Sequence, residues 1–226
     1  MPLDERRKLR LAFVVDLDQP ELRSDDVSHF RRVLRMEPGA ALNVSDGQGA
    51  WRRVRLGPAG SSLTIDGETQ SEVCPSQTTV AFAPTKGDRP EWTIQKLTEI
   101  GVSRIAALRT QRSVVKWDSN RAERQVEKWR KVAREAAMQS RRVFLPAIEP
   151  QTPIERFVSE EPAAVLCEPG GRRLKPGIDS CVVIGPEGGF SQSELDLASH
   201  VDLGTGTILK TETATVVAAG FLVAGA

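Results

Sequence analysis

Residues 181–195 read CVVIGPEGGFSQSEL, and this stretch decides the fold of the second half of the chain. The apolar run at 181–184 predicts a buried strand. A glycine-rich turn at 185–190 follows it directly, and Ser191 with Glu194 three residues later predicts a capping box at the start of a helix. Open α/β sheets bind ligands at the carboxyl ends of their strands, where glycines let the backbone approach a ligand closely. The stretch therefore predicts an α/β domain with a ligand loop.

A purely structural turn is the alternative for residues 185–190, because glycines also form turns that touch no ligand. The loop is neither a GxGxxG nor a Walker pattern, so nothing supports binding of a dinucleotide or a phosphate by those routes. A second glycine-rich turn, 203–207, leads to a predicted helix that Thr211 or Thr213 can cap. Two such turns around one short element are expected if both border a single pocket.

Alternating strands and helices precede this stretch, which is the pattern of an α/β domain with a mostly parallel sheet. Apolar runs predict strands at 79–83, 104–108 and 163–167, and helical periodicity predicts helices at 91–100, ending at Gly101, and at about 120–140. The last segment, 213–226, is apolar on all sides, so we expect it to be buried in the core or against a second subunit.

The N-terminal part has a different pattern of short strands separated by turn signals, which is typical of a small β-barrel. The expected strands are 11–15, 41–44, 51–56 and 62–65, interrupted by a helix at 25–34 with Ser24 or Asp25 as its cap. Pro75-Ser76 has the composition of a linker. We therefore expect two domains, a β-barrel at 1–72 and an α/β domain at 76–226.

The net charge is unevenly spread along the chain, and the middle third is basic, although the formal net charge of the whole chain is only +1. Residues 73–150 hold 15 Lys and Arg against 8 Asp and Glu, a net charge of +7, whereas residues 1–72 carry −1 and residues 151–226 carry −5. Such a basic block suits an anionic partner such as nucleic acid. A solvated helix face explains the count equally well.

Cysteines and histidines are too few and too scattered for a zinc site. The three cysteines, Cys74, Cys167 and Cys181, form no CxxC pair, and His29 and His200 are the only imidazoles. We expect neither disulfides nor a metal, and we interpret Cys167 and Cys181 as small apolar strand residues. No secretion signal or membrane-spanning run is evident, so we expect a cytoplasmic protein.

Two segments, IGPEGGFSQSEL at 184–195 and LGTGTILKTETA at 203–214, carry a family resemblance. They resemble the ribosomal RNA small subunit methyltransferase E family, which belongs to the SPOUT class of knotted methyltransferases. Motifs along the whole chain agree in order: 29–35 with Pro38-Gly39, 86–88, 95–102, 112–114 and 135–141. Within 203–210 the chain departs from the family's usual turn in length and in carrying Lys210 where an arginine is usual.

The resemblance implies an α/β fold with a SPOUT-type trefoil-knotted domain that binds S-adenosylmethionine, preceded by a small PUA-like RNA-binding β-barrel. It implies a homodimer that methylates N3 of a uridine in 16S ribosomal RNA. The residues that it assigns to the cofactor are Glu168, Gly185, Pro186, Glu187, Gly188, Gly189, Leu203, Gly204, Ile208, Leu209, Lys210, Thr213 and Ala214.

Four polar residues in the family's motifs are candidates for catalysis: Lys86, Arg112, Gln139 and Arg141. Our hypothesis is that they hold the RNA or stabilise a uridine anion at the dimer interface. Arginines on the helix at 120–140 can equally be solvated or paired with glutamates of that helix. Two other functions stay open: an RNA-binding protein without enzymatic activity, and a methyltransferase of the same class that acts on transfer RNA or another base.

Overall fold

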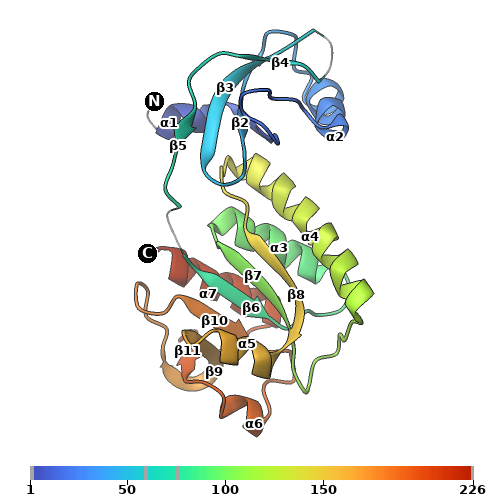
Figure 1. The fold of residues 1–226 in the computed structure, drawn as a ribbon. Helices are drawn as coiled ribbons and strands as arrows, with labels where there is room; N and C mark the ends of the chain where they lie inside the picture. Colours follow the sequence, from blue (N-terminus) through green and yellow to red (C-terminus); the bar gives the residue numbers. More distant parts are fainter. Residues whose placement is uncertain (1–2, 59–60, 75–76, 225–226) are drawn as a thin grey trace. The chain divides into compact units, whose positions relative to one another are not determined.

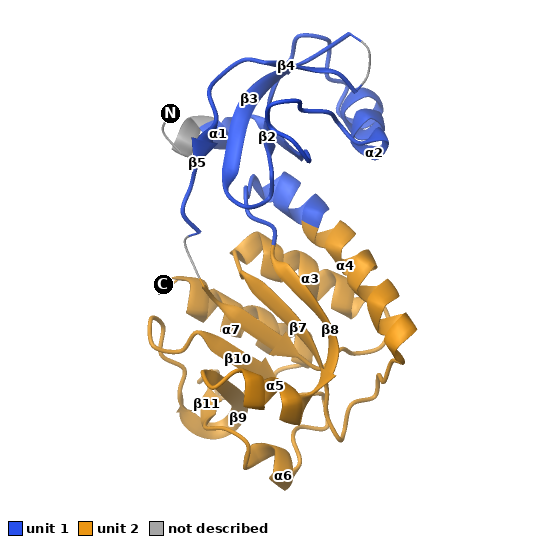
Figure 2. Cartoon of the chain, viewed as in Figure 1, with its two compact units in different colours: residues 1–74, 134–145 blue, residues 75–133, 146–226 orange. Residues whose placement is uncertain are grey.

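The computed structural model describes residues 3–58, 61–74 and 77–224. The chain forms two compact units (Figure 2): unit 1 is residues 1–74 with 134–145, and unit 2 is residues 75–133 with 146–226. Residues 134–145 were not expected in unit 1. They contain the end of the helix predicted at about 120–140, and nothing in the sequence interrupts that helix before residue 134. The predicted linker Pro75-Ser76 lies outside the described residues.

Unit 1 contains a mixed sheet, three short helical elements and the end of helix α4 (Ser119–Ser140). Its strands follow the order β1-β2-β3-β4, with β5 paired to β3; β1 and β2 are parallel and the other pairs antiparallel. All four predicted strands are found, with ends shifted by at most two residues. The elements are α1 (Leu3–Lys8), β1 (Arg10–Phe13), α2 (Ser24–Ser28), η1 (His29–Val33), β2 (Ala41–Ser45), β3 (Ala50–Leu56), β4 (Leu63–Ile65) and β5 (Gln70–Ser71).

A buried ion pair fixes residues 134–145 within unit 1. The Arg134 guanidinium donates from both terminal nitrogens to the Asp26 carboxylate, and one of them also donates to the carbonyl of Phe13 at 3.1 Å. Ala137 and Met138 pack into the same apolar cluster as the strands. Removing either charge of such a pair leaves the other buried and uncompensated.

The helix predicted at 25–34 is found as α2 followed by the π-helical turn η1. The predicted cap at Ser24 or Asp25 is wrong. The helix begins one residue earlier than expected, so the cap position falls on Arg23, which makes no capping hydrogen bond because its side chain has no acceptor.

Unit 2 is a three-layer α/β structure built on one parallel sheet, as predicted (Figure 1). The strands follow the order β11-β9-β10-β6-β7-β8, and every pair is parallel. The elements are β6 (Thr79–Phe82), α3 (Arg89–Ile100), β7 (Arg104–Arg109), α4 (Ser119–Ser140), β8 (Ala147–Pro153), α5 (Ile154–Glu160), β9 (Ala164–Arg173), β10 (Cys181–Ile184), α6 (Gln192–Leu195), β11 (His200–Asp202) and α7 (Thr211–Ala224).

The sheet buries both faces because alternate strand residues point to opposite sides. On β10, Val182 and Ile184 pack with α3, α4 and α7, whereas Cys181 and Val183 pack with α5 and Phe190. Helix α3 ends at Gly101, whose φ of 115° is left-handed, so the predicted stop is confirmed.

Three features of unit 2 differ from the sequence expectation. Strand β8 and helix α5 were not predicted, because the segment 147–153 contains two prolines and no alternation of apolar residues. Strand β9 continues six residues beyond the predicted end at 167, through a glycine pair that lets it lie against β11. A Cβ at Gly171 would lie 2.7 Å from the backbone of His200, which excludes a larger residue.

Helix α7 packs on β6, β10 and α3 through one side only. Ala214, Ala218 and Leu222 are buried there, whereas Phe221 on the other side is 41% exposed. Burial in the core is therefore found for one side of the helix, and burial of the other side against a second subunit stays a prediction. Its sequence leaves an apolar strip on the surface of unit 2.

Candidate functional site

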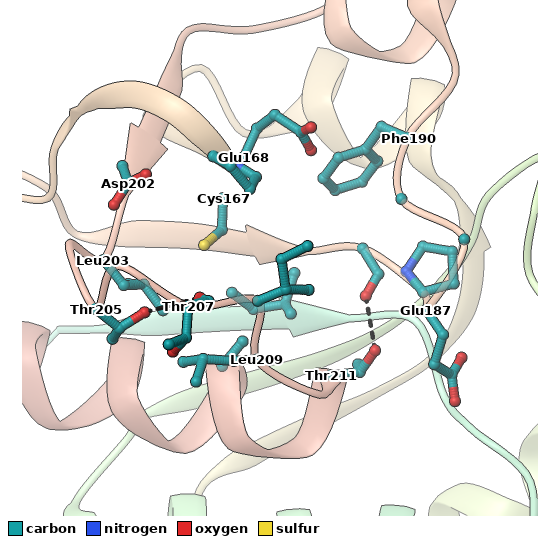
Figure 3. A pocket seen from close by; sticks show the side chains of 18 residues that line it. Cys167, Glu168, Glu187, Phe190, Asp202, Leu203, Thr205, Thr207, Leu209 and Thr211 are labelled. Carbon is teal, nitrogen blue, oxygen red and sulfur yellow. Dashed lines mark hydrogen bonds between the residues drawn. The ribbon is translucent and has the colours of Figure 1, made fainter.

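A cavity of about 300 Å³ lies at the carboxyl end of β10, beside the middle of β9 and the start of α7 (Figure 3). Its volume is at the lower end of those typical for small-molecule sites. Two loops border it: the 185–190 loop, which follows β10, and the 204–210 loop, which follows β11. The expected pocket between two glycine-rich turns is therefore present.

The 185–190 loop is compact, and the ring of its last residue, Phe190, packs close to its first residue, Gly185. Gly189 has a φ of 69°, which favours glycine, and its N–H donates to the carbonyl of Pro186 at 2.9 Å. The Phe190 ring is buried, and a Cβ at Gly185 would lie 3.1 Å from it. The predicted capping box of Ser191 and Glu194 is confirmed where α6 begins.

Thr211 connects the start of α7 to the 185–190 loop. Its hydroxyl donates to the carbonyl of Gly185 at 3.1 Å, as the dashed line in Figure 3 shows. The helix begins at Thr211 itself, so neither Thr211 nor Thr213 precedes it and the predicted cap is wrong. The threonine closes the cavity wall instead.

The Asp202 side chain connects strand β9 to the start of the 204–210 loop. One carboxylate oxygen accepts from the backbone N–H of Gly170 at 3.0 Å and the other from the N–H of Gly204. These backbone hydrogen bonds hold the pKa of Asp202 below its ordinary value. The carboxylate is therefore ionised at neutral pH, at the point where β11 enters the 204–210 loop.

Two carboxylates, of Glu168 and Glu187, and the thiol of Cys167 also line the cavity. Glu168 is half-buried, Glu187 is exposed, and Figure 3 shows both side chains at the cavity edge. Burial, with the charges of Asp202 and Glu168, raises the pKa of the Cys167 thiol to about 12. Burial likewise raises the pKa of Cys181 to about 12. Both cysteines lie in strands, as interpreted, and their thiols are protonated at neutral pH.

Most of the residues expected at the cofactor line this cavity: Glu168, Gly185, Pro186, Glu187, Gly188, Gly189, Leu203, Ile208, Leu209 and Ala214. Gly204, Lys210 and Thr213 do not, and all three are exposed. Phe190, Thr205 and Thr207 also line it, and they lie in the two turns that were expected to border the pocket. Sequence reasoning did not assign five further lining residues to the site: Cys167, Pro169, Ile184, Asp202 and Thr211. Their closeness in the chain to assigned residues is the signal that could have found them.

The four candidates for catalysis are distributed over both units. Arg112 lies in unit 2, and its guanidinium donates to the carbonyl of Gly188 at 2.8 Å. Lys86 is exposed in the turn between β6 and α3. Gln139 and Arg141 belong to unit 1, at the end of α4.

Arg141 has a local structural role at the end of α4. Its guanidinium donates to the carbonyls of Met138 and Gln139, two of the groups that a helix end leaves unpaired. Burial and the nearby Arg10 lower its pKa. The pairing considered for the arginines of this helix is found for Arg130, which binds Glu127.

Among the described residues there is no group of three or more His, Cys, Asp or Glu side chains that could hold a metal ion. Within the same residues, no helix is both long enough and apolar enough to cross a membrane.

Known families match both units. Residues 72–223 match the model of the RNA methyltransferase domain, and residues 22–63 match that of the RNA methyltransferase PUA domain. Ribosomal RNA small subunit methyltransferase E of Bacillus subtilis is 30% identical over 214 residues, which cover 84% of each chain. The chain belongs to this family. The methyltransferase E of Mycobacterium tuberculosis is 34% identical over 218 residues, covering 87% of this chain and 82% of the relative.

Solved structures of other methyltransferases have the same fold. A probable rRNA-methyltransferase from Porphyromonas gingivalis superimposes with a TM-score of 0.81 at 29% identity, over 93% of this chain and 95% of the other. A methyltransferase from Legionella pneumophila, solved with its bound cofactor SAM, has a TM-score of 0.80 at 26% identity with the same coverage. This chain thus has the mixed α/β fold of a methyltransferase that was solved with SAM, and its residues 22–63 match a PUA domain.

Proposed function

We propose that this chain transfers a methyl group from S-adenosylmethionine to N3 of a uridine in 16S ribosomal RNA of the small subunit. The observation that carries the proposal is the cavity between the 185–190 and 204–210 loops. It occurs in a chain of the methyltransferase E family, whose relatives are named for small-subunit ribosomal RNA. A 26%-identical protein of the same fold binds SAM.

The chemistry of the cavity wall fits this cofactor. Backbone groups of the glycine-rich loops can approach a flat ring closely, and Leu203, Ile208 and Leu209 provide apolar surface for it. The carboxylates of Glu168 and Glu187 suit ribose hydroxyls and a cationic ligand. We propose that the ten lining residues of the predicted set bind the cofactor directly and that Gly204, Lys210 and Thr213 complete the site at its rim.

The reaction requires a positioned, electron-rich acceptor. S-adenosylmethionine supplies an electrophilic methyl group on a positively charged sulfur. The imide N3 of uridine becomes an acceptor only as its proton leaves for a base or for water. We propose that Lys86, Arg112, Gln139 and Arg141 hold the RNA or stabilise the developing anion, since a guanidinium or ammonium near that charge lowers the barrier.

Calorimetry with S-adenosylmethionine separates this proposal from a protein that only binds RNA. Binding at micromolar concentrations is expected, and no binding at millimolar concentrations would leave only the RNA-binding alternative. Mass mapping of ribosomal and transfer RNA from cells lacking the gene separates the proposed substrate from others in the class. Loss of one N3-methyluridine from 16S ribosomal RNA is the expected result.

Unit 1 is proposed to be a PUA-like RNA-binding barrel, with residues 1–72 as its main part, and residues 76–226 a knotted methyltransferase domain. The bridge between Glu21, in the segment that follows β1, and Ser62, next to β4, supports closure of the sheet. The return of the chain from the edge strand β11 to α7, which packs on the central β6 and β10, supports threading through an earlier loop. Such threading is rare among folds. An experimental crystal structure traced through 185–211 tests it.

A homodimer is the oligomeric state that we propose, and the exposed apolar strip of α7 supports it. Val217, Gly220, Phe221 and Ala224 form this strip together with Pro176. Sedimentation should give twice the 24.7 kDa mass of the chain, and Phe221→Asp should give the monomer. An unchanged dimer in that variant would place the interface elsewhere. We also propose a cytoplasmic location, because ribosomal RNA is found there.

A further inference from the structure

Glu194 makes contacts that a helix cap does not require. Its side chain is fully buried, with 0% exposure, in a helix of only four residues. One carboxylate oxygen accepts from the backbone N–H of Ser191 at 2.8 Å, which is the usual capping-box bond. The other oxygen accepts from the backbone N–H of Gln111 at 2.7 Å, a residue 83 positions away.

Gln111 belongs to a rigid turn that follows β7, which we call the 110–113 turn. The Ser113 hydroxyl accepts from the N–H of Thr110 at 2.9 Å and lies 2.9 Å from its hydroxyl, with both residues buried. A second bond joins this turn to α6, because the Gln111 side chain donates to the Ser193 hydroxyl at 2.9 Å. The turn is therefore attached to α6 by main chain and side chain.

Arg112, which follows Gln111 in this turn, is exposed. One of its nitrogens donates to the carbonyl of Gly188, and a Cβ at Gly188 would lie 3.4 Å from the Arg112 side chain. That bond uses one of the five N–H groups of a guanidinium. The geometry points to Glu194 as a positioning residue, which holds the 110–113 turn against the 185–190 loop and so fixes Arg112 beside the methyl-transfer site. This inference rests on the proposed function.

A double-mutant cycle tests the inference. Glu194→Gln should lower kcat about tenfold, the value of one hydrogen bond to a charged group. The Kd for S-adenosylmethionine should change less than about twofold, because Thr211 and Phe190 still hold the 185–190 loop. In an Arg112→Ala background the same substitution should change kcat by less than about twofold. Equal losses in the two backgrounds would overturn the inference.

Asp196→Asn is the matched control, since it makes the same carboxylate-to-amide change at the residue that ends α6. Asp196 is exposed, and its carboxylate accepts from the Gln192 side chain four residues earlier. This variant should have wild-type kcat. If Glu194→Gln does not fold, Gln111→Ala replaces it in the cycle, with a loss of about threefold expected from the weaker neutral bond.

Amide hydrogen exchange gives a readout that does not depend on activity. The N–H of Gln111 should be protected in the wild type and in Asp196→Asn, and should exchange faster in Glu194→Gln. Unchanged protection in Glu194→Gln contradicts the inference even if the protein methylates no RNA. Wild-type kcat in Arg112→Ala would instead remove the role proposed for Arg112, while faster exchange would still support the contact itself.

Discussion

The two loops that border the cavity are held by different numbers of contacts. The 185–190 loop is bonded at Gly185 by Thr211, at Gly188 by Arg112 and at its end through Glu194. The 204–210 loop has a bond from Gly204 to Asp202 and one between Thr205 and Thr207, and its Ile208 side chain is 93% exposed. The 185–190 loop is thus held by hydrogen bonds from other parts of the chain. The 204–210 loop instead exposes apolar surface that a ligand or a second copy can cover.

The largest expected effect concerns Phe190, whose buried ring packs against the 185–190 loop. Phe190→Ala should destabilise the protein by about 3–5 kcal/mol, because the buried ring packs under Gly185 and against the sheet. Urea denaturation followed by circular dichroism measures it. Ile208→Ala, in the other loop, should change the free energy of unfolding by less than about 0.5 kcal/mol, since an exposed side chain loses little on truncation. A similar cost for both variants would abolish the distinction between the loops.

The next largest effect compares Thr211, which bonds to the 185–190 loop, with Thr205 of the 204–210 loop. Thr211→Val keeps the shape of the side chain and leaves the Gly185 carbonyl without its partner, so it should cost about 1–2 kcal/mol of stability or cofactor binding. Thr205→Val removes the exposed bond to the Thr207 carbonyl and should cost less than about 0.5 kcal/mol. Thermal unfolding with and without S-adenosylmethionine compares the two. The prediction is wrong if Thr205→Val is the more damaging change.

A third comparison of the two loops uses Gly189 and Gly206, one glycine from each loop with the same backbone angle φ. Gly189 and Gly206 both have a φ of 69°, and a Cβ at either would meet no atom within 4 Å. Alanine in this region costs about 1 kcal/mol. In Gly189→Ala the bonded loop cannot relax, so cofactor affinity should fall about fivefold. In Gly206→Ala the open loop can change its angle, and calorimetry should give an affinity within about twofold of the wild type.

The smallest effect concerns pH. The pKa of Asp202 is lowered in the folded protein by its bonds to Gly170 and Gly204, so its contribution to stability is present above the unfolded pKa. It is lost as the pH falls through the lower, folded value. Thermal midpoints measured downward from pH 5 should therefore decline less steeply for Asp202→Asn than for the wild type. Parallel curves would mean that the carboxylate does not stabilise the 204–210 loop.

The sequence predicted features whose determinants are close together in the chain. The strand at 181–184, the stop at Gly101 and the capping box at Ser191 depend on local patterns, and all are present. Contacts between distant segments could not be predicted. The second bond of Glu194, to Gln111, follows only from the parallel sheet that brings β7 and β10 to one edge.

Errors in prediction have the same origin. Thr211 was expected to cap a helix, whereas its hydroxyl binds the Gly185 carbonyl, which only the fold brings within reach. Strand β8 forms although its segment has no strand periodicity, because β7 provides the pairing edge. Thr213 does not line the cavity, because helical geometry turns it outward while Thr211 and Ala214 face the cavity, and its expected place at the cofactor stays a prediction.

The most direct test is methylation of small-subunit ribosomal RNA by the purified protein. Isolated 16S ribosomal RNA and intact small subunits are incubated with S-adenosylmethionine carrying a labelled methyl group, and digests are mapped by mass spectrometry. The account predicts one labelled methyl group, on N3 of a single uridine, and much less label with Gly189→Ala than with Gly206→Ala. Label on a ribose or another base, or no label in either substrate, would contradict it.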